Sequence, residues 1–223
     1  MSENVTLKID ENTAKMMMEY YASLKDYEVD FQILINKTDT RGTMSFLAPN
    51  YVRMDYSDPA TQVICFNGDY LTMYLPGTNA VLQQEPEGAS AKTSMGLSLM
   101  SRYYTVSYES GQAAVPLDEN SMEQVVKFIL SRKSSAEAFR YIKISVNPDT
   151  KLIRRMEAVT PAGVTFIFNF TNYRLNQGIS EKRFVYDPPS SANNLKYATF
   201  SPYSSKRTSQ ASSEFEPFVC PNR

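Results

Sequence analysis

The sequence predicts a mainly β domain built on one highly twisted antiparallel sheet of about ten strands, with short helices as its only cover. Two observations lead to this prediction. Segments of five to ten residues repeatedly alternate apolar with polar side chains, which is typical of strands with one face in water. Short turn sequences such as Asn67-Gly68-Asp69 separate neighbouring segments, and short turns favour a meander in which each strand pairs with the next. Such a sheet curls and leaves a concave apolar face to be covered.

The N-terminal part is predicted to begin with an amphipathic helix over residues 11–26, which Asp10 or Asn12 can cap. The apolar stripe of this helix consists of Ala14, Met17, Met18, Tyr21 and Leu24. At Tyr27 the apolar period changes from three or four to two, which marks the start of a strand. Strands are predicted over residues 27–36, 42–47, 51–56, 61–66, 70–75 and 80–84.

The middle of the chain interrupts this rhythm. A second helix is predicted over residues 89–104, with Met95, Leu99 and Tyr103 on its apolar side. Residues 121–132 fit a helical stripe and a strand equally well, so periodicity alone does not decide between them.

The second half of the chain contains further strand patterns. Strands are predicted over residues 140–147, 151–159, 164–173 and 181–187. From Ser190 onward the chain is rich in Ser, Pro and Asn, so we expect a loosely attached extension with a strand near residues 195–200.

Length and composition restrict the class of protein. A chain of 223 residues with 42% hydrophobic content can bury one sizeable core, so a single domain is expected. A formal charge of -1 and the lack of basic clusters argue against nucleic acid as a partner. No apolar run approaches the roughly 18 residues of a membrane span. The first residues lack a secretory signal, so the chain is expected to be cytoplasmic or to have lost its targeting segment.

The residues that most often carry chemistry are scarce. The sequence contains no His, which removes Ser-His-Asp and Cys-His triads and His-based metal sites. It also shows no Gly-rich phosphate loop and no set of metal ligands. We therefore expect no enzymatic activity, no cofactor and no metal. Cys65 and Cys220 are expected to be free thiols, although a bridge between them stays open.

An apolar row is the more informative feature. Phe166, Phe168 and Phe170 alternate along one strand, so their three rings share one face. Core packing is the ordinary interpretation of such a row. A strongly curved sheet with few helices need not fill its own interior, however, and eleven Met residues suit a surface that receives variable apolar ligands.

Several segments, taken together and in order, resemble the LolA family of periplasmic outer-membrane lipoprotein carrier proteins. They are GTMSFLAPNYVRMDY, then VICFNGDYLTMYLPGTNAV, and then a closing meander that begins ISVNPDTKLIRRMEAV and ends RFVYDPP. The resemblance spans about residues 11–190. It implies an unclosed antiparallel β-barrel of about 10 to 11 strands with a lid of short helices, and it favours a strand over residues 124–132. Residues 1–189 would form this domain and residues 190–223 an extension, either loosely structured or an added strand.

The resemblance also implies a site, in which one face of each strand lines a lipid-binding cavity. The lining residues would be Phe31, Ile33, Ile35, Met44, Phe46, Val52, Met54, Met73, Leu75, Ile142, Ile144, Phe166, Phe168 and Phe170. The lid over them would carry Met17, Met18, Tyr21, Met95, Leu99 and Tyr103. Implied partners are acylated lipoproteins or lipids, an inner-membrane ABC-type release complex and an outer-membrane acceptor. A monomer in the periplasm is expected, with the signal peptide absent from this sequence.

One position departs from the family pattern. Carriers of this family often have Arg directly before the Pro of the second strand, where it links barrel to lid, and this chain has Ala48 there. The lid latch is therefore expected to differ. The alternatives are the same fold with another lipid, an outer-membrane acceptor, an envelope sensor, or a protein-binding module without lipid.

Overall fold

The computed structural model describes residues 19–84 and 103–196, and in this part of the chain thirteen strands form one continuous sheet. The first six strands are β1 (Asp26–Ile35), β2 (Thr38–Leu47), β3 (Tyr51–Asp58), β4 (Ala60–Phe66), β5 (Leu71–Leu75) and β6 (Ala80–Gln84). The remaining strands are β7 (Tyr104–Tyr108), β8 (Val115–Pro116), β9 (Gln124–Arg132), β10 (Tyr141–Val146), β11 (Ile153–Val159), β12 (Thr165–Leu175) and β13 (Asn193–Lys196). The described residues also form two short 3-10 helices, η1 (Pro76–Thr78) and η2 (Glu181–Phe184).

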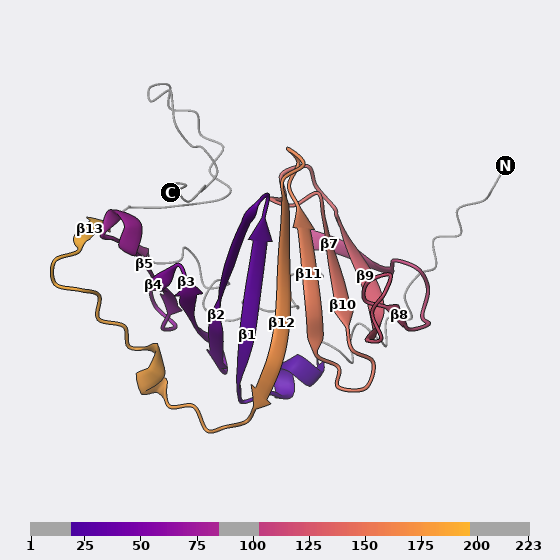
Figure 1. Cartoon of the computed structure of the whole chain (residues 1–223), viewed down its shortest axis with the longest axis horizontal. Coiled ribbons are helices and arrows are strands. Elements are labelled where there is room, and N and C mark those ends of the chain that lie inside the picture. The colour runs from indigo at the N-terminus through magenta and orange to yellow at the C-terminus, as the bar shows by residue number, and fades with distance from the viewer. Residues whose placement is uncertain (1–18, 85–102, 197–223) are drawn as a thin grey trace.

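Two antiparallel meanders meet side by side in the middle of the sheet. The strand order is β13-β6-β5-β4-β3-β2-β1-β12-β11-β10-β9-β7, and β8 pairs with β9. The join is the long antiparallel pair β1–β12, in which Phe31 lies opposite Phe170. Among these strands, β13 alone runs parallel to its neighbour, β6. Since β13 and β7 end the order without pairing to each other, the sheet is curved but unclosed (Figure 1), as predicted.

The predicted strands of both meanders are confirmed except for one. Residues 124–132 form a strand, which resolves the ambiguity of that segment. The strand predicted over residues 181–187 is wrong, because η2 and an irregular segment occupy this range. Ser180 caps η2 by accepting a hydrogen bond from the Lys182 N–H, and Phe184 is buried against a sheet face. The short strands β7 and β8 were not anticipated, and they raise the strand number above the predicted 10 to 11.

The helix prediction is confirmed in part where it can be compared. Residues 19–23 are helical, but the chain leaves the helix before Asp26, where β1 begins. Tyr104, the last residue of the second predicted helix, already belongs to β7. Residues 11–18 and 89–102 lie outside the described ranges.

The main core lies on one face of the sheet, which we call the inner face and which carries Val29, Phe31 and Ile33 of β1. Cross-strand partners share a face in an antiparallel sheet, so register assigns the other strands. The buried members of the core are Val29, Phe31, Ile33, Tyr104, Tyr108, Phe128, Leu130, Ile142, Ile144, Val146, Ile153, Ala158 and Phe170. Apart from the residues of β1, all of them come from β7 and β9–β12.

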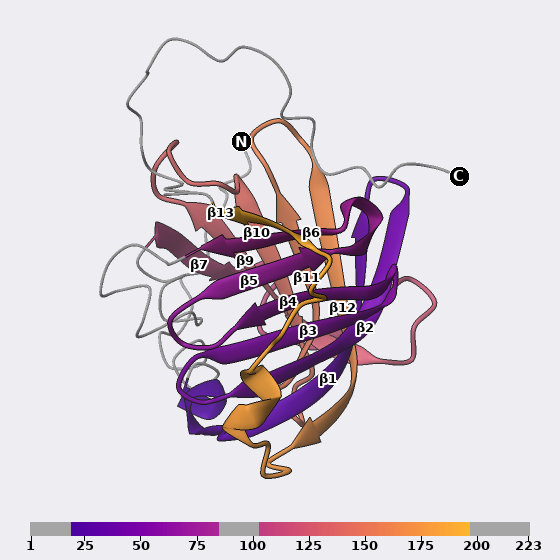
Figure 2. The ribbon, with the colours of Figure 1, turned by 90° about the vertical axis from the view of Figure 1, so that its left-hand side faces the viewer.

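The opposite, outer face is crossed by a segment that follows β12, residues 176–192, which we call the strap (Figure 2). It begins where the buried carboxylate of Asp26 accepts hydrogen bonds from the N–H groups of Gln177 and Gly178. Phe184 of the strap then packs with Val63 and Cys65 in a second apolar cluster. The strap ends at β13, which adds to β6, so the sheet continues past residue 189.

Candidate functional site

The candidate site is the inner face of the first meander, β2 to β6. A row of apolar residues crosses it perpendicular to the strands, because each residue pairs with the next on the neighbouring strand. From β1 to β6 this row, here called the Met row, contains Val29, Met44, Met54, Ile64, Met73 and Leu82. At about 4.8 Å per strand, six strands give a continuous apolar path of roughly 24 Å.

All fourteen residues predicted to line the cavity lie on the inner face. The structure divides them into two groups, however. The buried group, which fills the core, contains Phe31, Ile33, Ile142, Ile144 and Phe170. The half-buried group contains Ile35, Met44, Phe46, Val52, Met54, Met73, Leu75, Phe166 and Phe168. Only the second group still has surface with which to contact a ligand, and most of it lies on β2, β3 and β5.

On β4–β6, three further half-buried aliphatic residues of this face were not predicted from the sequence: Ile64, Leu71 and Leu82. In β4 the run Val63, Ile64, Cys65, Phe66 is apolar on both faces, because the strap covers the outer side of the strand. The alternation of apolar and polar residues therefore does not show which residues of β4 lie on the inner face. The signal that could have found Ile64 is its pairing with Met54, which follows from the tight β3–β4 connection.

Aromatic rings border the Met row on the side of the β1–β2 pair. The Tyr27 and Phe46 rings stack with centroids 4.9 Å apart, and Tyr21 meets Tyr27 edge to face at 6.4 Å. Burial raises the pKa of both Tyr21 and Tyr27, so these hydroxyls are neutral at physiological pH. The border is uncharged and suits an apolar ligand.

Of the six predicted lid residues, the structure describes Tyr21 and Tyr103. Tyr21 ties the helical turn to the sheet, since its hydroxyl accepts a hydrogen bond of 2.7 Å from the Ile153 N–H. Tyr103 is half-buried against the main core. Met17, Met18, Met95 and Leu99 lie outside the described residues. Ala48, at the position of the family's usual Arg, is exposed, and its N–H donates to the Lys25 carbonyl at 2.8 Å.

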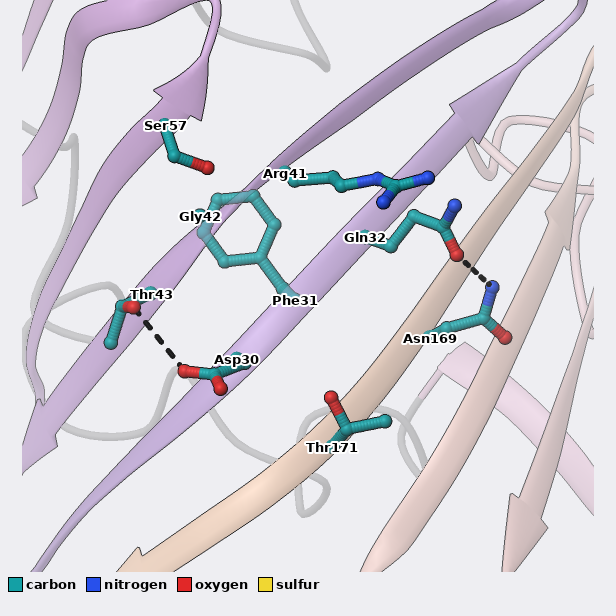
Figure 3. Close-up of a pocket in the computed structure, with 9 residues that line it drawn as sticks. All are labelled: Asp30, Phe31, Gln32, Arg41, Gly42, Thr43, Ser57, Asn169 and Thr171. Atoms are coloured by element: carbon teal, nitrogen blue, oxygen red, sulfur yellow. Dashed lines mark hydrogen bonds between the residues drawn. The ribbon is translucent and has the colours of Figure 1, made fainter.

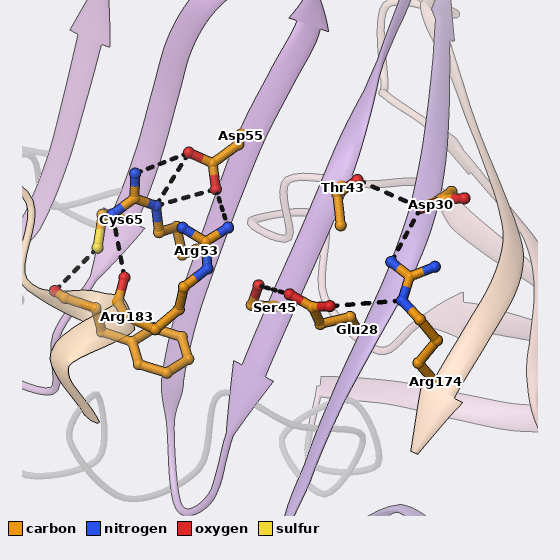
Figure 4. Close-up of polar contacts among 10 residues, drawn as sticks. Glu28, Asp30, Thr43, Ser45, Arg53, Asp55, Cys65, Arg174 and Arg183 are labelled. Carbon is orange, nitrogen blue, oxygen red and sulfur yellow. Dashed lines mark hydrogen bonds and ion pairs between the residues drawn. The ribbon is translucent and has the colours of Figure 1, made fainter. Parts of the chain in front are cut away.

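The polar groups of the outer face are largely satisfied by one another (Figure 4). Arg174 contacts Glu28 and Asp30, and Asp55 is shared by Arg53 and Arg183. Within residues 19–84 and 103–196 no three His, Cys, Asp or Glu side chains gather as a metal site would require. The helical segments of the same ranges include none that is long and apolar enough to span a membrane.

The unclosed sheet with its half-buried apolar inner face defines a protein of the open-barrel fold class. A family model described as "Outer membrane lipoprotein carrier protein LolA" matches residues 23–187. The chain belongs to the LolA family.

Comparison with solved structures finds similar folds at low sequence identity. An uncharacterized conserved protein from Thermus thermophilus is 11% identical with a TM-score of 0.56, over 83% of this chain and 98% of that one. Lipoprotein LppX from Mycobacterium tuberculosis is a weaker likeness, with 10% identity and a TM-score of 0.46 over 75% and 96% of the two chains. The Pseudomonas aeruginosa MucA/MucB complex matches at 13% identity and a TM-score of 0.46, over 78% and 60%. No curated protein sequence matches the chain.

Proposed function

We propose that this protein is a periplasmic carrier that shelters the acyl chains of lipoproteins on the inner face of β2–β6 and delivers them to the outer membrane. The observation that carries the proposal is the Met row, a continuous path of apolar side chains that are half-buried from β2 to β6. Membership of a family described by lipoprotein carriage supports the nature of the cargo.

The need for shelter follows from the hydrophobic effect. Each methylene removed from water contributes about 0.8 kcal/mol, so one acyl chain represents roughly 10 kcal/mol or more. The half-buried part of the Met row, from Met44 on β2 to Leu82 on β6, spans roughly 19 Å, a length comparable to that of an extended acyl chain. Met side chains adapt to different chain shapes at little cost, because their three rotatable bonds and polarizable sulfur accept many geometries.

Release is as necessary as binding for a carrier. On the proposed route an inner-membrane ABC-type release complex supplies the lipoprotein and an outer-membrane acceptor of higher affinity receives it, with this chain acting as a monomer. Residues 1–189 form the lipid-binding unit in this proposal, and residues 190–223 form an extension that adds β13 to the edge of the sheet.

The test compares two adjacent residues of β6 that point to opposite faces. Leu82 lies half-buried in the Met row, whereas Gln83 is exposed on the outer face. The protein is incubated with membrane vesicles that contain an acylated lipoprotein, and the soluble fraction is analysed by native mass spectrometry and lipid extraction. We expect a stoichiometric complex with the unmodified protein and with Gln83→Asp, and its loss with Leu82→Asp.

Two outcomes would contradict the proposal. If the unmodified protein binds neither lipoprotein nor free lipid, the fold remains but the inner face must serve a protein partner. If Leu82→Asp binds as well as Gln83→Asp, the cargo lies elsewhere. Met54→Asp, in the same row on β3, serves as a second test of the location.

A further inference from the structure

The outer face contains a pocket that is separate from the apolar site. A pocket of about 450 Å³ lies over the centre of the sheet, where β1, β2, β3 and β12 run side by side (Figure 3). Its lining residues are Asp30, Phe31, Gln32, Arg41, Gly42, Thr43, Ser57, Asn169 and Thr171. Apart from Phe31 and Gly42, every one of them carries a side chain that donates or accepts hydrogen bonds.

The hollow has a structural origin. The pairing register of β2 with β3 shifts between Arg41 and Gly42. A further shift occurs between Asp55 and Ser57 in the pairing of β3 with β4. Register shifts bend a strand and redirect its side chains. The outer face therefore opens here, in a stretch of sheet between the apolar cluster under the strap and the Arg155–Asp118 ion pair over β11.

A chain of hydrogen bonds holds the two amides of the pocket in fixed orientations. Arg155 Nε donates to Asn169 Oδ1 at 2.7 Å, and Asn169 Nδ2 donates to Gln32 Oε1 at 3.2 Å. Gln32 Nε2 in turn donates to Asp39 at 2.8 Å. Each of these contacts uses one N–H or one lone pair of an amide that has two of each. The second N–H and the second lone pair of each amide remain available to a ligand, in orientations set before it arrives.

The charges of the pocket are balanced. Asp30 and Arg41 are its charged lining residues, and each is paired with an opposite charge outside the lining, Asp30 with Arg174 and Arg41 with Asp39. Burial alone would raise the pKa of Asp30, but hydrogen bonds from Asn172 and Arg174 outweigh it and lower the pKa below its ordinary value. The carboxylate is thus ionised and acts as an acceptor. A lining without net charge favours an uncharged ligand over an ion.

We propose that this outer-face pocket binds a neutral polyhydroxylated ligand, with the size and chemistry of a mono- or disaccharide. Neighbouring hydroxyl groups of a sugar each donate and accept, and planar amides and a carboxylate with free positions on adjacent strands complement such pairs. The hydroxyls of Thr43, Ser57 and Thr171 add contacts of the same kind. The volume lies within the range of small-ligand pockets. The proposal is independent of the carrier function.

Titration calorimetry and saturation-transfer NMR with glucose, N-acetylglucosamine and maltose test it on the full chain. We expect at least one of these sugars to bind, and Thr171→Val to weaken the binding roughly tenfold by removing one hydrogen-bonding group. Thr171 is exposed, so this nearly isosteric change leaves the fold intact. Asn169→Leu is expected to abolish binding. Gln83→Leu, which alters an exposed amide of the outer face outside the pocket, is expected to have no effect.

Three results would overturn the proposal. The first is that none of the three sugars binds. The second is binding that Thr171→Val and Asn169→Leu both leave unchanged, which would place the sugar elsewhere. The third is tighter binding of glucose 6-phosphate than of glucose, which would make the pocket an anion site based on Arg41. Retention of sugar binding by Leu82→Asp separates this site from the apolar one.

Discussion

The rings of Phe31 and Tyr56 meet edge to face across Gly42, with centroids 5.0 Å apart and an interplanar angle of 74°. Gly42 lies between them on β2, since it pairs with Phe31 on one side and with Tyr56 on the other. The contact links β1 to β3 over Gly42 of β2, where no side chain separates the two rings. Aromatic residues commonly cover strand glycines in this way.

Gly42→Ala is expected to destabilise the protein by about 1–3 kcal/mol, the usual cost of overpacking. A Cβ atom at this position would lie 2.1 Å from the Asp55 carbonyl oxygen and 2.7 Å from the Phe31 ring. The first of these is a backbone atom, so β3 would have to move. Urea denaturation measures the change. Gly77→Ala is the control, because a Cβ at Gly77 would contact nothing within 4 Å, and a loss of equal size there would contradict the explanation.

A strand can be predicted from sequence when one of its faces is exposed to water and the other is buried, because apolar and polar residues then alternate. β1 and β12 alternate clearly because their outer faces carry Asp30, Gln32 and Asn169, and both strands were predicted. β4 is covered on both faces, so its contribution to the site, Ile64, was missed.

The segment 181–187 shows the opposite error, because its residues alternate as in a strand although it forms none. Phe184 and Tyr186 alternate with Arg183 and Val185 as in a strand, but the segment lies across the outer face of the sheet and buries Phe184 there. Local periodicity cannot distinguish strand pairing from packing on a face. The polar pocket was equally hidden, since it depends on register shifts between β2, β3 and β4 that single-strand patterns do not report.

Phe184→Ala is expected to cost about 3–5 kcal/mol, because it removes a fully buried ring from the strap. Phe184 is 1% exposed, and the centroids of the Phe184 and Tyr51 rings are 5.5 Å apart. Its neighbour Val185 is 72% exposed, so Val185→Ala is expected to change stability by less than about 0.5 kcal/mol. Chemical denaturation of both variants gives the comparison. Similar losses in the two would mean that the strap is not anchored by Phe184.

Tyr21→Phe is expected to destabilise the protein by about 1–3 kcal/mol, since it leaves the Ile153 N–H without its acceptor in a largely buried site. The Tyr21 hydroxyl accepts from this N–H at 2.7 Å. Tyr20→Phe, on the preceding residue, is the control and is expected to stay within about 0.5 kcal/mol. Hydrogen exchange at the Ile153 amide provides a local measure. Unchanged protection of that amide in Tyr21→Phe would refute the assigned contact.

The ion pairs of Asp55 predict a loss of stability in acid. Burial alone would raise the pKa of Asp55, but hydrogen bonds from Arg53 and the charge of Arg183 outweigh it and hold the pKa below its ordinary value of 3.8. A lowered pKa in the folded state means that the contribution is complete above the ordinary value and is lost as the pH falls through the folded value. The carboxylate is about one-third exposed, so the contribution is at most about 1 kcal/mol.

Asp55→Asn tests this dependence. The unmodified protein is expected to lose stability more steeply than the variant as the pH falls below about 4, whereas the difference between them is constant between about pH 6 and 8. Urea midpoints at a series of pH values give both curves. Parallel curves throughout the acid range would show that Asp55 carries no pH-dependent stability.

Cys65 is expected to react slowly with thiol reagents while the strap is in place. Its side chain is buried, its thiol donates a hydrogen bond of 3.2 Å to the Phe184 carbonyl oxygen, and burial raises its pKa. Both the protonated state and the cover of the strap oppose reaction, because the thiolate is the nucleophile.

In a Cys220→Ser background, maleimide labelling of Cys65 at neutral pH should therefore be limited by local opening. Phe184→Ala should accelerate it roughly a hundredfold, if about 3 kcal/mol of the anchoring of the strap is lost. Val185→Ala should leave the rate unchanged, and full labelling in urea confirms that the thiol is intact. Equal labelling rates in the two variants would mean that access to Cys65 does not depend on the anchoring of the strap by Phe184.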